Sequence, residues 1–218
     1  MKHLPKNLPL LNAQEIRVLG SLIEKSKTTP DYYPMTLNAL TLACNQKSSR
    51  KPVVEYDEET VVLTLDSLKK KGLISTATGG GSRAVKYKHN LSIAFPLVPA
   101  ELAVICLLFL RGSQTPGEIN TNSNRLYDFE SLEDVQQVLE KLADSEMPYI
   151  VQLPKRTGQK EMRFMHLFSG EPAIEEDDIR EEPARKSVNE LESRVATLEE
   201  NYTQLKEDFD KLMKELLG

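Results

Sequence analysis

Two stretches of the sequence repeat the same order of apolar positions, and this internal repeat limits most strongly how the chain can fold. The first copy lies within residues 1–96 and the second within 97–170. The matched residues are Ile16, Val18, Leu19 and Leu22 with Leu102, Val104, Ile105 and Leu108, then Val61, Leu65 and Leu68 with Val135, Leu139 and Leu142, and Tyr87 and His89 with Phe164 and His166. A pattern that recurs in this way predicts two copies of one supersecondary unit.

Each copy is expected to contain three helices followed by two strands. In the first copy the apolar spacing places them at about residues 12–25, 36–45, 57–71, 73–78 and 83–88. In the second copy the corresponding segments are about 99–110, 116–127, 131–144, 149–154 and 161–168. Asn12 is a suitable N-cap, and Glu15 three residues later completes a capping box. Gly79, Gly80 and Gly81 suit the turn of a hairpin.

Three helices and a hairpin, in this order, are typical of a winged helix. We therefore expect a mainly α fold with small β-hairpin wings, in the α+β class: two tandem winged-helix domains followed by a C-terminal coiled-coil helix. The first copy is longer by the loop 46–56. The expected divisions are 1–96 for the basic first domain, 97–170 for the second, 171–186 for an acidic linker and 187–218 for the coiled coil.

The last part of the sequence carries a heptad pattern. Apolar residues recur every seven positions, and a second apolar set follows each of them by three. The two sets are Val188, Val195, Tyr202, Phe209 and Leu216, and Leu191, Leu198, Leu205 and Leu212. A seam of about four heptads predicts a coiled coil, so we expect self-association as a homodimer. The alternative is a single helix folded back on the domains, which would need a wider apolar stripe.

Charge is distributed unevenly along the chain, whose formal net charge is -5. Residues 1–96 hold 14 Lys and Arg against 8 Asp and Glu, a net charge of +6. Residues 97–170 carry -3, and residues 171–218 carry -8. An anionic partner would therefore be attracted to the first copy.

Several short motifs resemble those of a known family. They are residues 43–50 (Ala-Cys-Asn-Gln-Lys-Ser-Ser-Arg) with Pro52-Val53, Leu110-Arg-Gly with 114–117 (Gln-Thr-Pro-Gly), Arg125 with Tyr127, and 165–170 (Met-His-Leu-Phe-Ser-Gly). Together they closely resemble the YceH-like family of bacterial proteins, over residues 11–170. The resemblance implies a tandem winged-helix fold, in agreement with the repeat, and it implies no activity.

The sequence lacks the motifs of common enzymes. It has 3 His and no Gly-x-Ser-x-Gly, HExxH or phosphate-binding Gly-Lys-Ser/Thr motif. His89 and His166 lie at equivalent strand positions beside aromatic residues, and neither is accompanied by a second group that would make it a metal ligand or a catalytic base, so we expect packed core histidines. Cys44 and Cys106 lie in apolar helical patterns and are expected to be core thiols, without a disulfide. We therefore expect a non-enzymatic protein with no cofactor and no metal.

No stretch of the sequence suits a membrane-spanning helix. The longest apolar run, residues 102–110, is shorter than the roughly 20 residues that a span requires. Residues 1–11 contain two prolines and lack an apolar signal core. We expect a cytoplasmic protein without a membrane partner.

The basic residues of the first copy form two groups, one in the loop 46–51 and one on the wing 83–88. The candidate nucleic-acid contacts are Lys47, Ser48, Ser49, Arg50, Lys51, Arg83, Lys86 and Lys88. Such contacts hold phosphates without reading bases. Double-stranded DNA is therefore the first candidate partner, and solvated surface charge is the alternative.

The third helices do not resemble conventional readers of DNA bases. Their expected outward faces are Glu59, Leu63, Asp66 and Lys70 in the first copy, and Glu133, Gln137, Glu140 and Asp144 in the second. Carboxylates on such a face repel phosphates. The alternative function is a protein–protein interaction scaffold without DNA binding, using Leu63, Asp66, Glu140 and the heptad seam.

Overall fold

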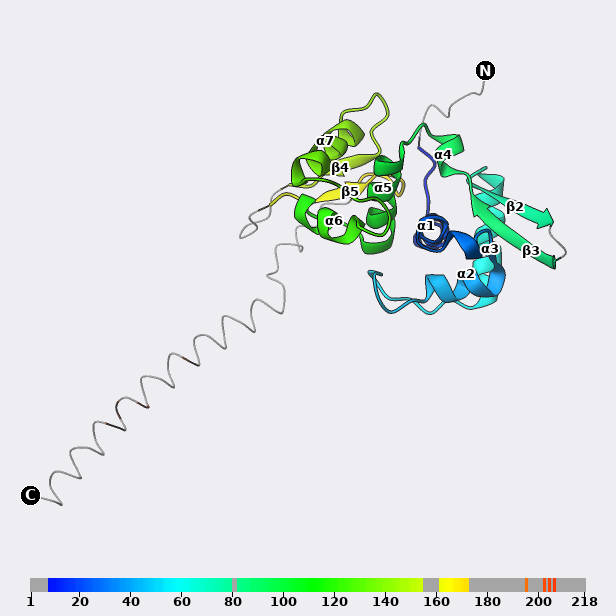
Figure 1. The fold of residues 1–218 in the computed structure, drawn as a ribbon, viewed down its shortest axis with the longest axis horizontal. Coiled ribbons are helices and arrows are strands. Elements are labelled where there is room, and N and C mark those ends of the chain that lie inside the picture. Colours follow the sequence, from blue (N-terminus) through cyan, green and yellow to red (C-terminus); the bar gives the residue numbers. More distant parts are fainter. Residues whose placement is uncertain are drawn as a thin grey trace, which may run out of the picture. The chain divides into compact units, whose positions relative to one another are not determined.

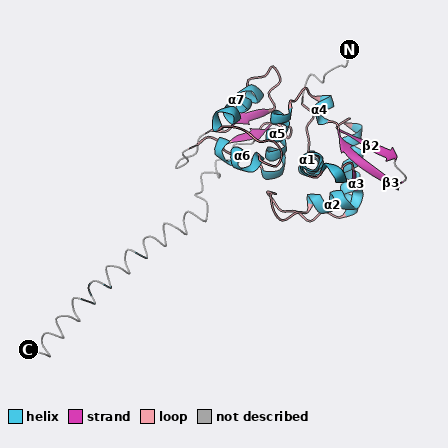
Figure 2. Cartoon of the chain, viewed as in Figure 1, coloured by secondary structure: helices cyan, strands magenta, loops and turns pink. Residues whose placement is uncertain are grey.

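The computed structural model describes residues 8–79, 82–154 and 161–172, with Val195, Tyr202, Gln204 and Lys206; for residues 78, 79, 82 and 83 only the backbone is described. The chain divides into two units, Met1–Ala173 and Ile174–Gly218. The first combines helices with small antiparallel sheets, an α+β arrangement (Figures 1 and 2). In the second unit, the four described residues are helical and exposed.

The first repeat contains the elements expected from its apolar spacing, with small shifts at their ends. They are α1 (Ala13–Thr28), β1 (Met35–Thr36), α2 (Leu37–Cys44), α3 (Glu58–Lys70), β2 (Ile74–Gly79) and β3 (Ser82–His89), with a 3-10 turn at Pro30–Tyr32 and a short α4 (Leu91–Ala94). The predicted capping box is confirmed. The Asn12 side chain accepts from the backbone N–H of Glu15 at 2.9 Å, and the Glu15 carboxylate accepts from Asn12 N–H at 2.9 Å.

The second repeat follows the same order of elements. They are α5 (Pro99–Arg111), α6 (Pro116–Ser123), α7 (Leu132–Ala143), β4 (Ile150–Gln152) and β5 (Phe164–His166). The helix expected over 116–127 ends four residues early, where the backbone N–H groups of Leu126 and Tyr127 both donate to Ser123 O and close a turn.

Each repeat also pairs its hairpin with a segment between its first and second helices, which the sequence did not reveal. In the first repeat this segment is β1, and the sheet order is β1-β3-β2 with Met35 opposite Tyr87. In the second, Gln114 forms an isolated bridge with Phe164, and their backbones exchange hydrogen bonds of 3.1 and 2.8 Å. A strand of one or two residues is too short to show an alternating pattern.

Both repeats tie the first turn of their first helix to the third helix through a carboxylate. Glu15 of α1 contacts Lys71, at the end of α3, at 2.7 Å. Glu101 of α5 contacts Lys141 of α7 at 2.6 Å. The two carboxylates are nearly buried and also cap their own helices. The internal repeat is therefore visible in side-chain contacts as well as in the order of elements.

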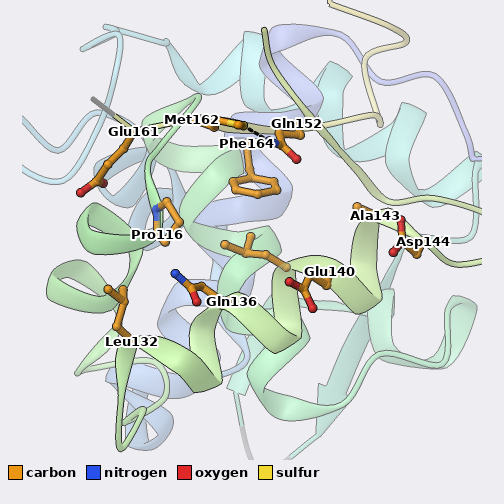
Figure 3. Close-up of a pocket in the computed structure, with 11 residues that line it drawn as sticks. Pro116, Leu132, Gln136, Glu140, Ala143, Asp144, Gln152, Glu161, Met162 and Phe164 are labelled. Atoms are coloured by element: carbon orange, nitrogen blue, oxygen red, sulfur yellow. Dashed lines mark hydrogen bonds between the residues drawn. The ribbon is translucent and has the colours of Figure 1, made fainter. Parts of the chain in front are cut away.

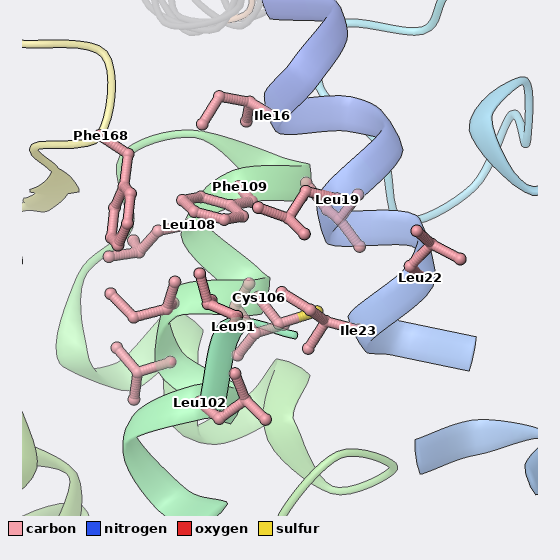
Figure 4. Close-up of a cluster of buried hydrophobic side chains, with 14 of the residues drawn as sticks. Ile16, Leu19, Leu22, Ile23, Leu91, Leu102, Cys106, Leu108, Phe109 and Phe168 are labelled. Carbon is pink, nitrogen blue, oxygen red and sulfur yellow. The ribbon is translucent and has the colours of Figure 1, made fainter. Parts of the chain in front are cut away.

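The first helices of the two repeats pack directly against each other and share one core (Figure 4). Ile16, Leu19 and Ile23 of α1 face the side of α5 that carries Cys106 and Phe109 (Figure 4). The helices approach closely at Gly20, whose carbonyl oxygen accepts from Cys106 Sγ at 3.5 Å. Gly20 and Cys106 occupy equivalent positions in the two repeats, so the contact relates similar surfaces of both copies.

Gly20 leaves room for α5 because it has no side chain. A Cβ there would lie 2.9 Å from Leu110 Cδ2 and 3.1 Å from Phe109 Cβ, and both side chains are buried. We expect Gly20→Ala to lower the free energy of unfolding by about 1–3 kcal/mol, although alanine favours a helix. Urea denaturation followed by circular dichroism measures this.

The matched control is Gly117→Ala in α6, where the nearest atom to a new Cβ is 3.8 Å away. This variant should be as stable as the wild type or slightly more so. A Gly20→Ala protein with unchanged stability would mean that the two helices do not depend on this close approach.

Candidate functional site

The loop between α2 and α3 is the main difference between the repeats. Its two ends are held together by Asn45, whose Nδ2 donates to Tyr56 O at 2.7 Å and whose Oδ1 accepts from Tyr56 N–H at 2.8 Å. Residues 46–55, which we call the strap, leave the helices at this point. Five hydrogen bonds described next show that the strap folds back on the first helices of the two repeats.

Arg50 anchors the strap to α1. Its Nη1 and Nη2 donate to the two carboxylate oxygens of Glu24 at 3.0 and 2.6 Å. Nη2 also lies 2.9 Å from the carbonyl oxygen of Ala43 and 3.0 Å from Oε1 of Gln46. The Arg50 side chain is 0% exposed. A two-point pair of this kind fixes both position and orientation of the guanidinium.

The electrostatics of Glu24 reflect this pair. Burial acts to raise the pKa of the Glu24 carboxyl, but the hydrogen bonds and positive charge of Arg50 outweigh it, so the pKa lies below its usual value. Glu24 is therefore ionised at neutral pH and remains a full counter-charge for Arg50.

A second buried arginine, Arg17, connects the end of α2 to the strap. Nη1 of Arg17 donates to Cys44 O at 3.1 Å, and its Nη2 donates to Pro52 O. Burial, followed by the nearby charge of Arg50, lowers the pKa of Arg17. Arg17 lies on α1, so the same helix that packs on α5 also fixes the strap.

The strap reaches the second repeat as well. Lys51 N–H donates to Leu110 O at 2.8 Å, and Nη2 of Arg111 donates to Ser49 Oγ at 2.8 Å. Leu110 and Arg111 are the last residues of α5. The strap thus connects α1, α2 and α5.

These contacts correct part of the predicted nucleic-acid interface. Arg50 was expected at the surface, but its side chain is buried and its guanidinium forms an ion pair with Glu24. It is therefore not available to bind a phosphate. Ser49 is exposed, but its hydroxyl already accepts a hydrogen bond from Arg111. Lys47, Ser48 and Lys51 are exposed as expected. Sequence patterns could not separate Arg50 from its neighbours, because its burial depends on Glu24, far away in the sequence.

The wing presents two of its three predicted cations. Lys86 and Lys88 alternate with Tyr87 along β3 and so share one face of the sheet; Lys88 is exposed and Lys86 half-buried. Tyr87 packs on the core from the other face, as expected. The side chain of Arg83 lies outside the described part of the chain. Among described side chains, no ion pair involves Lys86 or Lys88.

The outward face of α3 agrees with the helical-wheel expectation. Leu63 is 64% exposed and Asp66 is exposed, while Val61, Leu65 and Leu68 are buried. An apolar side chain beside a carboxylate on this face is unfavourable for contact with phosphates. Of the predicted seam residues, Val195 and Tyr202 are helical and exposed; Val188, Leu191, Leu198, Leu205, Phe209 and Leu212 lie outside the described residues.

The second repeat, like the first, holds part of its charge in internal ion pairs. Two of its cations are held in ion pairs: Lys141 by Glu101 at 2.6 Å, and Arg163 by Glu118 at 2.7 Å. The predicted contact residue Glu140 is exposed on α7 and has no ion pair with a described residue. Among the described residues, Lys47, Lys51, Lys86 and Lys88 of the first repeat are therefore cations without an ion pair, and Glu140 of the second repeat is a carboxylate without one.

A groove of about 510 Å³ lies between α7 and the β4–β5 hairpin (Figure 3). It is lined by Pro116, Leu132, Gln136, Leu139, Glu140, Ala143, Asp144, Gln152, Glu161, Met162 and Phe164. The amide of Gln152 contacts the Met162 sulfur across one edge. The sequence indicated only Glu140 and Asp144 of this set, because the hairpin residues become neighbours of α7 through folding.

His166 is buried and His89 is half-buried, which agrees with the packed histidines expected from the sequence. His166 packs edge-on against Phe109 with ring centroids 4.9 Å apart, and His89 lies 6.1 Å from Tyr33. Burial lowers the pKa of each histidine to about 4. Both are therefore neutral at physiological pH. As the pH falls below about 6.5, the two imidazoles become protonated in the unfolded chain but stay neutral in the folded protein. The folded state is therefore favoured most above about pH 6.5 and is progressively destabilised as the pH falls toward 4.

The two cysteines are not activated as nucleophiles. Cys44 and Cys106 are buried free thiols. Burial raises the pKa of Cys44 to about 11 and raises that of Cys106 as well, so neither is a thiolate at neutral pH. Within the described ranges no three His, Cys, Asp or Glu residues gather as metal ligands. No described helix combines the length and apolar character needed to span a bilayer.

The buried pair gives a test of how the strap is held. Arg50→Ala would leave the Glu24 carboxylate, whose side chain is 14% exposed, with Lys25 at 3.4 Å as its remaining counter-charge, so we expect the free energy of unfolding to fall by about 2–4 kcal/mol. Lys47→Ala, in the same strap but exposed, should change it by less than about 0.5 kcal/mol. Urea denaturation measures both.

A double variant shows whether the two charges act together. Glu24→Gln combined with Arg50→Ala should lower the free energy of unfolding by less than the sum of the two single changes. The reason is that Glu24→Gln alone leaves the Arg50 charge unpaired, and Arg50→Ala then removes that charge. Additive losses, or an Arg50→Ala protein as stable as Lys47→Ala, would contradict the anchoring role of Arg50.

Known proteins resemble the chain over almost its whole length. The family model "Protein of unknown function, DUF480" matches residues 11–159. The UPF0502 protein Shewana3_1622 of Shewanella sp. (strain ANA-3) is 45% identical over 94% of this chain and 99% of its own. A UPF0502 protein of Serratia proteamaculans (strain 568) is 44% identical over 94% of this chain and 96% of its own, and one of Opitutus terrae is 46% identical over 88% and 84%. This agrees with the resemblance found in the sequence motifs, and the chain belongs to the DUF480 family, whose members among these relatives are named UPF0502 proteins.

Proposed function

We propose that this chain is a non-enzymatic, DNA-associated protein in which two winged-helix units are joined through their first helices. The first unit contacts the phosphate backbone of duplex DNA through Lys47, Lys51, Lys86 and Lys88. The observation that carries the proposal is that these four cations, all in the first repeat, have no carboxylate partner among the described residues, whereas Lys141 and Arg163 of the second repeat are ion-paired. A free ammonium on a basic unit is available to displace counterions from DNA.

The architecture supports this function. In each repeat the order is helix, short strand, two helices and a hairpin, with the strand pairing to the second hairpin strand. This is the order of a winged helix, a fold that binds DNA through its third helix and wing. In this chain the exposed carboxylates and Leu63 on α3 argue against deep entry of that helix into the major groove. The contacts are therefore with the backbone and are not selective for sequence.

The second candidate function is a protein-interaction scaffold without DNA binding. It is favoured by the 64% exposure of Leu63 and by the free carboxylates of the second repeat. The heptad seam over 187–218 contributes to either function by joining two copies of the chain. A cytoplasmic location suits both.

The DNA proposal predicts binding that weakens steeply with salt. A 20-base-pair duplex at low ionic strength should bind the wild-type protein, and Lys86→Ala/Lys88→Ala should bind more weakly with a salt slope smaller by about two. Fluorescence anisotropy measures both quantities.

The matched control is Arg125→Ala/Lys206→Ala, which removes the same charge from exposed positions outside the first repeat. Its DNA affinity and salt slope should stay at the wild-type values. A wild-type protein that leaves the duplex unbound would remove the DNA function and favour the scaffold. An equal effect of the two double variants would show that only overall charge matters.

Self-association through the heptad seam has its own test. Deletion of residues 183–218 should convert a homodimer to a monomer in sedimentation equilibrium, because the apolar seam is removed while the two repeats keep their shared core. A truncated protein with the same subunit number as the full chain would rule out the seam as the interface.

A further inference from the structure

The groove of the second repeat has an apolar floor and partly exposed apolar edges. Leu139 of α7 and Phe164 of β5 both line it, and the Phe164 ring is visible in Figure 3. At its edges Leu132 is 38% exposed and Met162 is 44% exposed. Exposed apolar side chains grouped around a depression are typical of a surface that binds another chain.

Three carboxylates border this groove, and no described cation lines it. In Figure 3, Glu161 and Asp144 appear at opposite sides of the groove, and Glu140 lies between them. None of the three forms an ion pair or side-chain hydrogen bond with a described residue. The carboxylates are thus spread along the groove and do not converge on a single point.

The nearest described cations are directed elsewhere. Lys141, next to Glu140 on α7, reaches Glu101 of α5 at 2.6 Å. Arg163, next to Met162, donates to Glu118 at 2.7 and 2.9 Å and to Ser113 O at 2.8 Å. Both cations are therefore engaged by the fold itself, and the negative charge of the groove is left for a partner.

We propose that this groove binds a basic amphipathic helix of a partner protein. Apolar residues along one side of such a helix would cover Leu139, Phe164 and Met162. Lysine or arginine residues beside them would face Glu140, Asp144 and Glu161, which speeds association and selects for cationic partners. Nucleic acids and acidic segments are repelled by the same carboxylates. The acidic segment 171–218 of this chain is therefore an unsuitable occupant.

This interaction is separate from DNA binding. It uses the second repeat alone, whereas the proposed DNA contacts lie on the first. Loss of one activity by substitution should leave the other intact, so the two proposals fail independently.

The test uses the full chain and a fluorescein-labelled model helix of 14 residues, two copies of Leu-Lys-Lys-Leu-Leu-Lys-Leu. Its control peptide has Glu in place of every Lys. We expect the basic peptide to bind in an anisotropy titration and the acidic one not to bind. Glu140→Gln/Asp144→Asn/Glu161→Gln keeps the shape of the groove, and should weaken binding of the basic peptide by at least about tenfold.

A matched variant separates the groove from overall charge. Glu55→Gln/Glu58→Gln/Glu59→Gln removes three exposed carboxylates of the first repeat, and should keep wild-type affinity for the peptide. The groove triple variant should in turn bind duplex DNA at least as tightly as the wild type and with the same salt slope, because none of its three positions belongs to the proposed phosphate contacts.

The side-chain amides of Gln136 and Gln152 report the location, because both line the groove. With 15N-glutamine labelling, their NMR signals should shift on addition of the basic peptide. Equal peptide affinity in the two triple variants, or unmoved Gln136 and Gln152 signals, would overturn the proposal. Absence of binding to the wild type would also overturn it.

Discussion

The packing of α1 against α5 at Gly20 is the contact on which the arrangement of the two repeats depends. Every residue of α5 from Ala100 to Leu110 is buried, so this helix has no face directed to solvent. A helix that is apolar all round must be covered on all sides. Its own repeat covers one side, and α1 covers another. The close approach at Gly20 also brings the end of α5 within reach of the strap.

The strap uses this proximity. A loop that carries three cations would be expected to extend into solvent, but Arg17, Glu24 and Arg50 hold it against α1, and Leu110 and Arg111 hold it against α5. Burying an ion pair is costly, so its contribution lies in fixing one arrangement of the loop more than in net stability. The exposed lysines on either side of Arg50 are thereby held on a rigid segment. A surface whose charges are fixed in place loses less entropy on binding.

Periodicity predicted the helices of both repeats because apolar stripes record which face is buried, and the capping box at Asn12 followed from local hydrogen bonding. Local patterns could not predict the role of Arg50, since its sequence context matches that of Lys47 and Lys51. Nor could they predict β1, which is too short to show alternating apolar and polar residues. The role of Gly20 was also missed, because it depends on the packing of α5 against α1. The groove carboxylate Glu161 was missed for the same reason: folding, and not spacing, places the hairpin beside α7. Apolar spacing along the sequence does not show which residues distant in the chain become neighbours in the fold.

The burial of α5 on all sides also affects how the protein can be divided. A fragment cut between the repeats would expose the α1 face of Leu19 and Ile23 on one piece, and Cys106 and Phe109 on the other. Neither repeat is then an autonomous folding unit, although each resembles a complete module in the sequence. Unfolding should be a single cooperative event across both repeats. An insertion or duplication that separated the repeats would expose the face of α5 that packs on α1, unless another element buried that face.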